Sequence, residues 1–110
     1  MKQGEIWYTS LNPTEGSEQA GYMPVLVLSG NLANEYAPVV ICCPLTTKLK
    51  NYQGNPILEP NAQNGLKEKS EVMMIHIRSL TKTRLKEKIG TVPKSTIQQM
   101  KQTLDDLLNY

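Results

Sequence analysis

Two polar loops carry the residues of this chain that are best suited to chemistry. Residues 12–21 follow a first β-rich run and residues 46–55 follow a third, so both loops emerge at one end of a sheet if those strands run the same way. Hydroxyls, cations and exposed aromatic rings at one rim suit single-stranded RNA, whose bases stack and whose phosphates pair with cations. The side chains that would share this rim are Glu18, Gln19, Tyr22, Thr46, Thr47, Lys48, Lys50, His76 and Arg78.

Each of these features also has a structural interpretation, which spacing alone favours. Two lysines keep a loop solvated, Thr46 and Thr47 can cap the backbone of their own loop, and a lone His76 at a strand end is usually satisfied locally. No Gly-rich phosphate loop, Ser-His-Asp set or acid pair at glycosidase-like spacing is visible in the sequence. The residues alone therefore leave RNA binding and a plain structural role both open.

Composition bounds the kind of molecule that could place these side chains. The chain has 110 residues, a mass of 12.3 kDa, 39% hydrophobic and 20% charged residues, ordinary values for one soluble globular domain over residues 1–110. No apolar run approaches the ~20 residues of a membrane span, and no signal-peptide core follows the first residues, so we expect a cytoplasmic protein without membrane contact. The net charge of +2 is too small to argue for nucleic acid by itself.

The cysteine and histidine content argues against a metal site. Cys42 and Cys43 are adjacent, so on a strand they would point to opposite faces, and a bridge between them would be strained. His76 is the only histidine and there is no Cys-x-x-Cys motif, which leaves a zinc site almost without ligands. We therefore expect two free thiols, no metal and no cofactor.

Apolar runs and turn residues predict a mainly β chain. The predicted strands span residues 4–11, 22–29, 38–45, 56–60, 71–77 and 88–92. The strand over 22–29 is nearly continuous in apolar residues, which indicates burial on both faces. Residues 31–37 are expected to form a connection with one helical turn, 61–65 carry an Asn-Gly turn signal, and 78–84 are expected to form a basic connecting segment.

The last part of the chain changes to a helical period. One face carries the apolar residues Ile97, Met100, Leu104, Leu107 and Leu108. Strands followed by one terminal helix predict a small, strongly bent antiparallel barrel with the helix packed on it. A barrel this small leaves apolar surface for a two-fold partner, so we expect a homodimer. The C-terminal leucines together with Met73 and Met74 are the candidates for its interface.

Short motifs occur in a definite order along nearly the whole chain. They are Gly4-Glu5-Ile6-Trp7, Asn12-Pro13-Thr14, Gly16-Ser17-Glu18-Gln19-Ala20-Gly21, Pro24-Val25-Leu26-Val27-Leu28-Ser29, Pro44-Leu45-Thr46-Thr47, Ile77-Arg78, Arg84-Leu85 and Ile89-Gly90. In this order and spacing the motifs resemble the MazF/PemK family of toxin endoribonucleases. The resemblance implies an SH3-like barrel of about seven strands with a C-terminal helix, assembled as a homodimer.

The same resemblance implies an activity and a partner. Members of the family cleave single-stranded RNA at short sequences without metal, by attack of the ribose 2′-OH on the adjacent phosphate. They are held inactive by an antitoxin whose disordered, often acidic segment covers the RNA groove. The reaction needs a proton acceptor, a proton donor for the leaving 5′-oxygen, and cationic stabilisation of the phosphorane.

Site residues follow from the resemblance position by position. Thr46 matches the active-site threonine of the family, Glu18 matches the acidic residue of its Ser-Glu-Gln loop, and Arg84 joins the residues expected to bind RNA. The catalytic arginine of the family stands directly before the proline of the second strand, where this chain has Met23. Two further departures are Ile75, which replaces a carboxylate, and Thr81, which replaces an aspartate.

Met23 bears most strongly on the expected activity, because methionine has neither charge nor donor hydrogen. It is either an inactivating substitution that lets a lethal toxin be tolerated or the mark of a natural, weakly active homologue. We favour both over a rearranged site using His76, Arg78 and a loop lysine, because a phosphorane stabiliser needs placement as well as charge. We therefore expect impaired cleavage.

Two other functions stay open at this point. The chain could be a non-catalytic member that binds RNA or an antitoxin, or a gyrase-poisoning toxin on the same barrel. A gyrase poison acts through residues of its terminal helix on a protein target. The loops around Thr46-Thr47 and Glu18-Gln19 favour RNA, because a gyrase poison would not need them.

Overall fold

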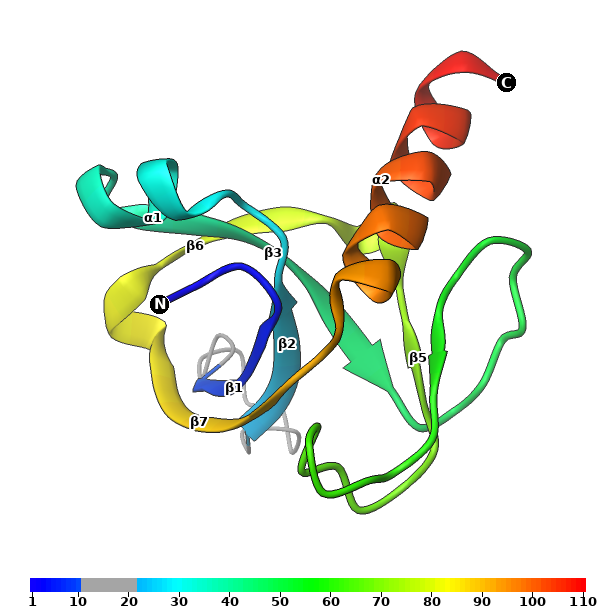
Figure 1. The fold of residues 1–110 in the computed structure, drawn as a ribbon, viewed down its shortest axis with the longest axis horizontal. Coiled ribbons are helices and arrows are strands. Elements are labelled where there is room, and N and C mark those ends of the chain that lie inside the picture. The colour runs from blue at the N-terminus through cyan, green and yellow to red at the C-terminus, as the bar shows by residue number, and fades with distance from the viewer. Residues whose placement is uncertain (11–21) are drawn as a thin grey trace, which may run out of the picture.

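Seven strands and a C-terminal helix make up the architecture that the computed structural model gives for residues 1–10 and 22–110 (Figure 1). In chain order the elements are β1 (Glu5–Ser10), β2 (Tyr22–Val27), α1 (Asn31–Tyr36), β3 (Val39–Thr46), β4 (Ile57–Leu58), β5 (Ser70–Val72), the 3-10 helix η1 (Met74–His76), β6 (Arg78–Thr81), the 3-10 helix η2 (Lys82–Arg84), β7 (Leu85–Thr91) and α2 (Lys94–Asn109). The sheet order is β4-β5-β3-β2-β1-β7, and β6 pairs with β3. This curled, mainly β sheet with a terminal helix confirms the predicted fold class.

The relative direction of β1 and β3 decides whether their carboxyl ends lie at one end of the sheet. β1 pairs antiparallel with β2, and β2 pairs antiparallel with β3, so β1 and β3 run the same way. The carboxyl ends of these strands, Ser10 and Thr46, are therefore at the same end of the sheet. The predicted parallel direction of the first and third strands is confirmed.

Apolar side chains cover both faces of the central strands β2 and β3. In Figure 1, β1, β2, β3, β6 and β7 curl around one interior, whereas β5 and α2 lie on the other side of β3. The interior of the curl is filled by Val25, Val27, Val40, Cys42, Leu80 and Leu85. The second core includes Leu26, Cys43, Leu45, Val72, Met74 and Met100. The burial of the second strand on both faces is confirmed, because Val25, Leu26 and Val27 have no exposed surface.

The adjacent cysteines belong to these two different cores. Cys42 and Cys43 are free thiols without exposed surface, and burial raises the pKa of Cys42 to about 11 and that of Cys43 to about 12. Because the reactive species is the thiolate, we expect neither cysteine to react with a thiol reagent in the native protein at pH 8. Both should react when the chain is unfolded in denaturant, which absorbance of the released aromatic thiolate would measure. Rapid labelling of the native protein would contradict this assignment.

Helix α2 packs on the second core as far as Leu104, and its last turns are open. Ile97 and Met100 are buried in the second core, whereas Leu107 is 43% exposed and Leu108 is 75% exposed. In Figure 1 the second half of the helix extends away from the sheet. The predicted apolar face therefore divides into a packed part and an open part. Within the described ranges, no helix is both long and apolar enough to cross a membrane.

The predictions for the segments after β5 were partly wrong. The predicted strand 71–77 ends at Val72, and the predicted basic connection 78–84 contains β6. Both β5 and β6 pair with β3, with Val72 opposite Leu45 and Arg78 opposite Cys42. Residues 73–77 therefore lie opposite only residues 43–44 of β3, and the three extra residues are accommodated by the turn of η1.

The same rearrangement corrects the expected dimer surface. Met73 and Met74 are 5% and 0% exposed, so they belong to the interior of the chain and cannot offer an interface. Successive residues of a strand point to opposite faces, but the turn at η1 lets both methionines point inward. Elsewhere the differences are small: the last strand begins at Leu85 rather than at residue 88, and residues 31–36 form the short helix α1.

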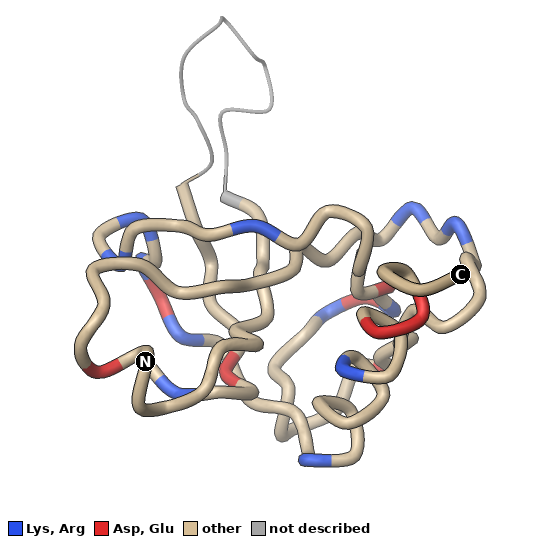
Figure 2. Tube along the Cα trace, turned by 90° about the horizontal axis from the view of Figure 1, so that it is seen from above, with Lys and Arg blue, Asp and Glu red and all other residues tan. Residues whose placement is uncertain are grey.

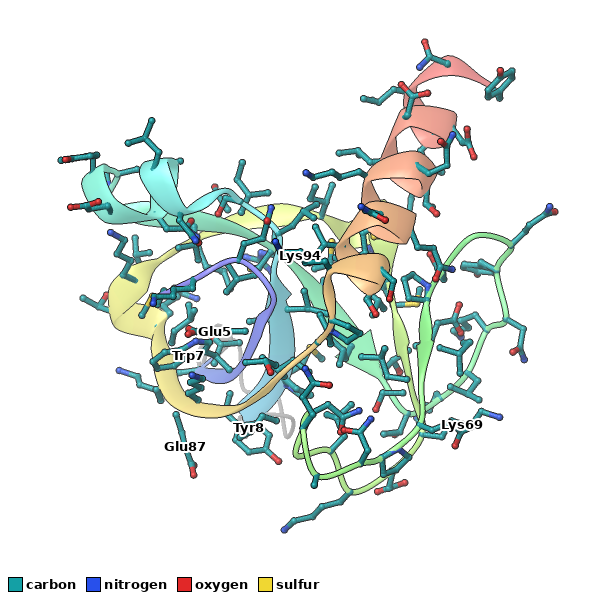
Figure 3. All side chains as sticks on the ribbon, in the orientation of Figure 1. Glu5, Trp7, Tyr8, Lys69, Glu87 and Lys94 are labelled. Atoms are coloured by element: carbon teal, nitrogen blue, oxygen red, sulfur yellow. The ribbon has the colours of Figure 1, made fainter. Side chains whose placement is uncertain are left out.

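A buried carboxylate joins β1 to β7 inside the curl. The Trp7 Nε1–H donates to Glu5 Oε1 at 2.9 Å, and the Lys88 ammonium lies 3.3 Å from Glu5 Oε2. Figure 3 shows Glu5 and Trp7 together in this interior, while Glu87 on β7 points away from the molecule. Burial alone would raise the pKa of the Glu5 carboxyl. The hydrogen bonds and the nearby Lys88 ammonium lower that pKa by more, so it lies below its ordinary value.

Candidate functional site

A cavity of about 400 Å³ opens at the end of the sheet where β2 begins and β3 ends. It is lined by Met23, Val25, Pro44, Leu45, Thr46, Lys50, Met73, His76 and Arg78. The antiparallel register of β2 and β3 explains why these residues meet. Val25 is paired with Pro44, and continuing that register by two residues places Met23 across from Thr46. Both residues therefore lie on the sheet face that also carries Val25.

The rim of the cavity carries a hydroxyl and three basic side chains. Thr46 is partly buried, and its Oγ1 accepts a hydrogen bond from the Lys48 N–H at 3.1 Å. Lys50, His76 and Arg78 are exposed and come from three different parts of the chain: the loop after β3, η1 and β6. No carboxylate is among the described residues that line the cavity. The rim is therefore suited to an anion such as a phosphate.

A larger hollow of about 610 Å³ lies between the 53–54 segment and α2, but its chemistry is different. Its lining consists of glutamines, a threonine, Asp106, Leu107 and Tyr110, and it contains no basic side chain among the described residues. Figure 2 shows acidic positions on the last turns of α2, and basic positions spread over several other segments. The smaller cavity is therefore the better site for an anionic ligand.

The structure brings together five of the residues singled out in the sequence: Met23, Thr46, Lys50, His76 and Arg78. Lys48 is exposed in the loop after β3 but does not line the cavity. Thr47 lines a separate hollow of about 170 Å³ on the Tyr8 side of the sheet. Glu18 and Gln19 lie outside the described residues, and so does the side chain of Tyr22, whose backbone begins β2.

Arg84 precedes β7, three strands along from Thr46 on β3, at the same end of the sheet. Its carbonyl accepts a hydrogen bond from Thr9 Oγ1 at 2.8 Å, and Thr9 is paired with Met23. The order across this end is therefore Thr46, Met23, Thr9 and the chain at Arg84. Arg84 does not line the cavity.

Sequence reasoning missed Glu71, which organises the loop beside the cavity. Glu71 has no exposed surface and stands on β5 opposite Thr46. Its Oε1 accepts hydrogen bonds from the backbone N–H groups of Lys50 (2.6 Å) and Asn51 (2.8 Å). Its Oε2 accepts from the Tyr52 N–H (3.1 Å) and from Asn55 Nδ2 (2.7 Å). Burial raises the pKa of Glu71, but these bonds to the ionised form outweigh it, so the pKa is lowered.

The loop has a second attachment, on α2. Thr103 Oγ1 donates to the Gly54 carbonyl at 2.6 Å, and Gln99 Nε2 donates to the same oxygen at 3.2 Å. Gly54 has a φ of +90°, and a Cβ on it would contact the Thr103 side chain at 3.0–3.1 Å. The segment from Lys50 to Asn55 is thus held between β5 and α2.

Two signals in the sequence could have found these residues. Glu71 directly precedes the apolar run Val-Met-Met-Ile, and a charge at the start of a buried run needs hydrogen-bond partners if it is buried with it. Thr103 lies on the apolar face of the helix period, where a hydroxyl needs a partner. The apolar walls Val25, Pro44 and Leu45 had no signal beyond their place in strands. Within residues 1–10 and 22–110, no three His, Cys, Asp or Glu side chains gather in a way that could hold a metal ion.

Comparison with known proteins identifies the family of the chain and agrees with its fold. Residues 2–108 match the model of the PemK-like, MazF-like toxin of type II toxin-antitoxin systems. The chain is 28% identical over 106 residues to an endoribonuclease MazF of Staphylococcus saprophyticus, covering 96% of this chain and 88% of the relative. It is also 28% identical over 105 residues to the endoribonuclease EndoA of Bacillus subtilis, covering 94% and 90% of the two chains.

Solved structures give the same answer for the architecture. MazF of Deinococcus radiodurans superposes with a TM-score of 0.79 at 26% identity, covering 100% of this chain and 97% of that one. A MazE-MazF structure from the same organism gives a TM-score of 0.80 at 26% identity, covering 98% and 95%. With a family match over nearly its whole length and this fold, the chain belongs to the PemK-like, MazF-like toxins of type II toxin-antitoxin systems.

Proposed function

We propose that this chain is a toxin that acts on single-stranded RNA at the cavity between Met23 and Thr46. The observation that carries the proposal is the convergence of one hydroxyl and three basic side chains, Lys50, His76 and Arg78, on a rim without a described carboxylate. The endoribonucleases named among its relatives support RNA as the substrate. Glu18, Gln19, Tyr22, Thr47, Lys48 and Arg84 belong to the same proposal as residues that contact the RNA.

The proposed reaction uses protein groups and the RNA itself. The ribose 2′-hydroxyl gives its proton to a base and its oxygen bonds to phosphorus; the bond from phosphorus to the 5′-oxygen breaks, and that oxygen takes up a proton, which leaves a 2′,3′-cyclic phosphate and a 5′-hydroxyl. Thr46 would donate to a phosphoryl oxygen, Lys50 and Arg78 would stabilise the negative phosphorane, and His76 could move a proton. Met23 supplies no donor at the place where the family has its catalytic arginine, so we propose that cleavage by this chain is slow.

RNA binding can be measured directly even though cleavage is slow, and it tests the proposed site. We expect a fluorescently labelled pool of random single-stranded RNA to bind the protein and to bind less tightly as salt rises, because phosphate contacts release counterions. Changing Lys48 and Lys50 together to alanine should flatten the dependence of log Kd on log salt by about 1.4, or ~0.7 per lost contact with a single strand. Fluorescence anisotropy would measure both quantities.

A charge-matched control separates the site from general electrostatics. Lys94 and Lys101 are exposed on α2, away from the cavity lining. Changing both to alanine removes the same charge and should change the salt slope little. If the two double variants lose the same slope, or if the protein does not bind the pool, the cavity is not an RNA site.

The partner proposed for this chain is a cognate antitoxin with a disordered C-terminal segment. The MazE-MazF structures of Deinococcus radiodurans support this kind of partnership. A segment with acidic side chains would complement the basic rim of Lys50, His76 and Arg78 and would exclude RNA from it. A cytoplasmic location, where RNA is available and free thiols stay reduced, belongs to the same proposal.

A homodimer is proposed from the open part of α2. Leu107 and Leu108 are exposed there, and Ile75 is 58% exposed on η1, which packs against the same helix. We expect sedimentation at micromolar concentration to give twice the 12.3 kDa chain mass, and Leu108→Glu to shift the protein toward the monomer. Leu32→Glu on α1 is the matched control, since Leu32 is 74% exposed. A wild-type protein that stays monomeric would contradict the proposal.

A further inference from the structure

Glu71 is a buried carboxylate that the proposed reaction does not use. All four of its hydrogen bonds come from one segment, residues 50–55, and three of them come from consecutive backbone N–H groups. No Lys or Arg side chain of the described residues forms an ion pair with it. Its negative charge is therefore stabilised by three main-chain N–H groups of the loop and by the side-chain amide of Asn55.

The conformation of the loop fits this role. Asn51, the middle donor, has a φ of +56°, in the left-handed region that asparagine tolerates better than most residues. Successive backbone N–H groups around a left-handed residue form a concave nest that binds an anion. In this chain the anion is the Glu71 carboxylate, so the loop closes on a residue of its own fold rather than on a ligand.

The same contacts determine where Lys50 stands. Its backbone N–H is 2.6 Å from Glu71 Oε1, while Lys50 itself lines the cavity with Thr46. Glu71 is also the residue opposite Thr46 in the pairing of β5 with β3. One side chain thus connects the strand that presents the hydroxyl with the loop that presents the ammonium group.

We infer that Glu71 is a positioning residue, whose carboxylate holds the main chain of residues 50–52 and thereby places the Lys50 ammonium at the RNA-binding rim. This inference rests on the proposed function, because the rim matters only if RNA binds there. It assigns Glu71 no contact with RNA and no proton transfer. Its effect on RNA binding must pass through Lys50 and the loop.

A double-mutant cycle tests that indirect action. Glu71→Gln keeps the size of the side chain but turns an amide N–H₂ toward backbone N–H donors, and Glu87→Gln removes the same charge from an exposed position on β7 (Figure 3). Lys50→Ala is combined with each, and binding of the labelled random RNA pool is measured over a salt series. With the native Glu71, Lys50→Ala should lower the salt slope by about 0.7.

The expected result is that Lys50→Ala loses most of its effect in the Glu71→Gln protein and keeps it in the Glu87→Gln protein. An equal effect in both backgrounds would overturn the inference and leave the proposed function standing, because a merely structural role predicts additive changes. Failure of the wild-type protein to bind RNA would instead overturn the proposed function, and this inference with it.

Two further measurements test the inference, and the first applies even if the Glu71→Gln protein does not fold. Asn51 is exposed, so Asn51→Ala, which disfavours the left-handed turn, and Asn51→Gly, which permits it, can replace Glu71→Gln in the cycle. Alanine should reduce the effect of Lys50→Ala, and glycine should preserve it. Amide hydrogen exchange of Lys50, Asn51 and Tyr52 reports loop order without RNA. Slow exchange that persists in a folded Glu71→Gln protein would overturn the inference.

Discussion

Replacing Met23 with arginine is expected to raise the rate of RNA cleavage by about 100- to 1,000-fold, the range that one preorganised donor typically contributes. Met23 lines the cavity across from Thr46, so an arginine there would place a planar donor fork beside that hydroxyl. It could pair with two oxygens of the scissile phosphate. Primer extension on a long RNA, with a time course for both proteins, would measure the change.

Three further variants define what the rescue depends on. Met23→Lys should rescue less, because a point charge cannot reproduce the bidentate geometry. Thr46→Ala in the Met23→Arg protein should abolish the gained activity, and His76→Ala should lower it only if His76 moves a proton. A Met23→Arg protein that folds and binds RNA but cuts nothing would show that Ile75 and Thr81 mark a retired site. Robust cleavage by the Met23 protein would show that the chemistry never depended on this position.

Alanine at Gly90 is expected to lower the free energy of unfolding by about 3 kcal/mol, at the upper end of the usual cost of overpacking. Gly90 lies on β7 beneath the 61–65 turn, and a Cβ on it would overlap the main chain of Gln63 and Asn64. The turn is bonded to β7 here, since the Thr91 N–H donates to the Gln63 carbonyl at 2.9 Å. The overlapping atoms all belong to the backbone of Gln63 and Asn64, so no flexible side chain can move aside to relieve the clash.

Gly30→Ala provides the matched comparison for this substitution. A Cβ on Gly30 would meet nothing within 4 Å, and its φ of −70° suits any residue. Its stability should therefore change by no more than about 0.5 kcal/mol. Urea unfolding followed by circular dichroism would compare the two proteins. Equal midpoints for Gly90→Ala and Gly30→Ala would show that the turn can move away from β7 at little cost.

The central strands were predictable because their signal is local. A nearly unbroken apolar run over 22–29 has few places in a small protein other than the middle of a sheet, and β2 lies there. Successive side chains of a strand point to opposite faces, which predicted that Cys42 and Cys43 would be separated, and they lie in two different cores. The cavity residues Met23, Thr46, Lys50, His76 and Arg78 could be grouped beforehand because strand direction and family motifs agree.

The parts that were not predicted depend on contacts between distant segments. Residues 73–77 resemble a strand in composition, but β5 and β6 share one edge of β3, and this geometry forces the turn at η1. No local pattern shows that Glu71 binds the backbone at residues 50–52, which lie about twenty positions earlier in the chain. The exposed last turns of α2 have the same period as the packed part of the helix, so sequence alone does not separate them.

The attachment of the 50–55 loop through main-chain atoms has a consequence for how this protein can evolve. Glu71 bonds to backbone N–H groups, and Thr103 bonds to the Gly54 carbonyl, so the outward side chains of Lys48, Tyr52 and Gln53 carry no share of these bonds. Mutation can exchange those side chains while the path of the loop stays the same. Related proteins can therefore differ in the exposed side chains of this loop while the loop backbone keeps its conformation.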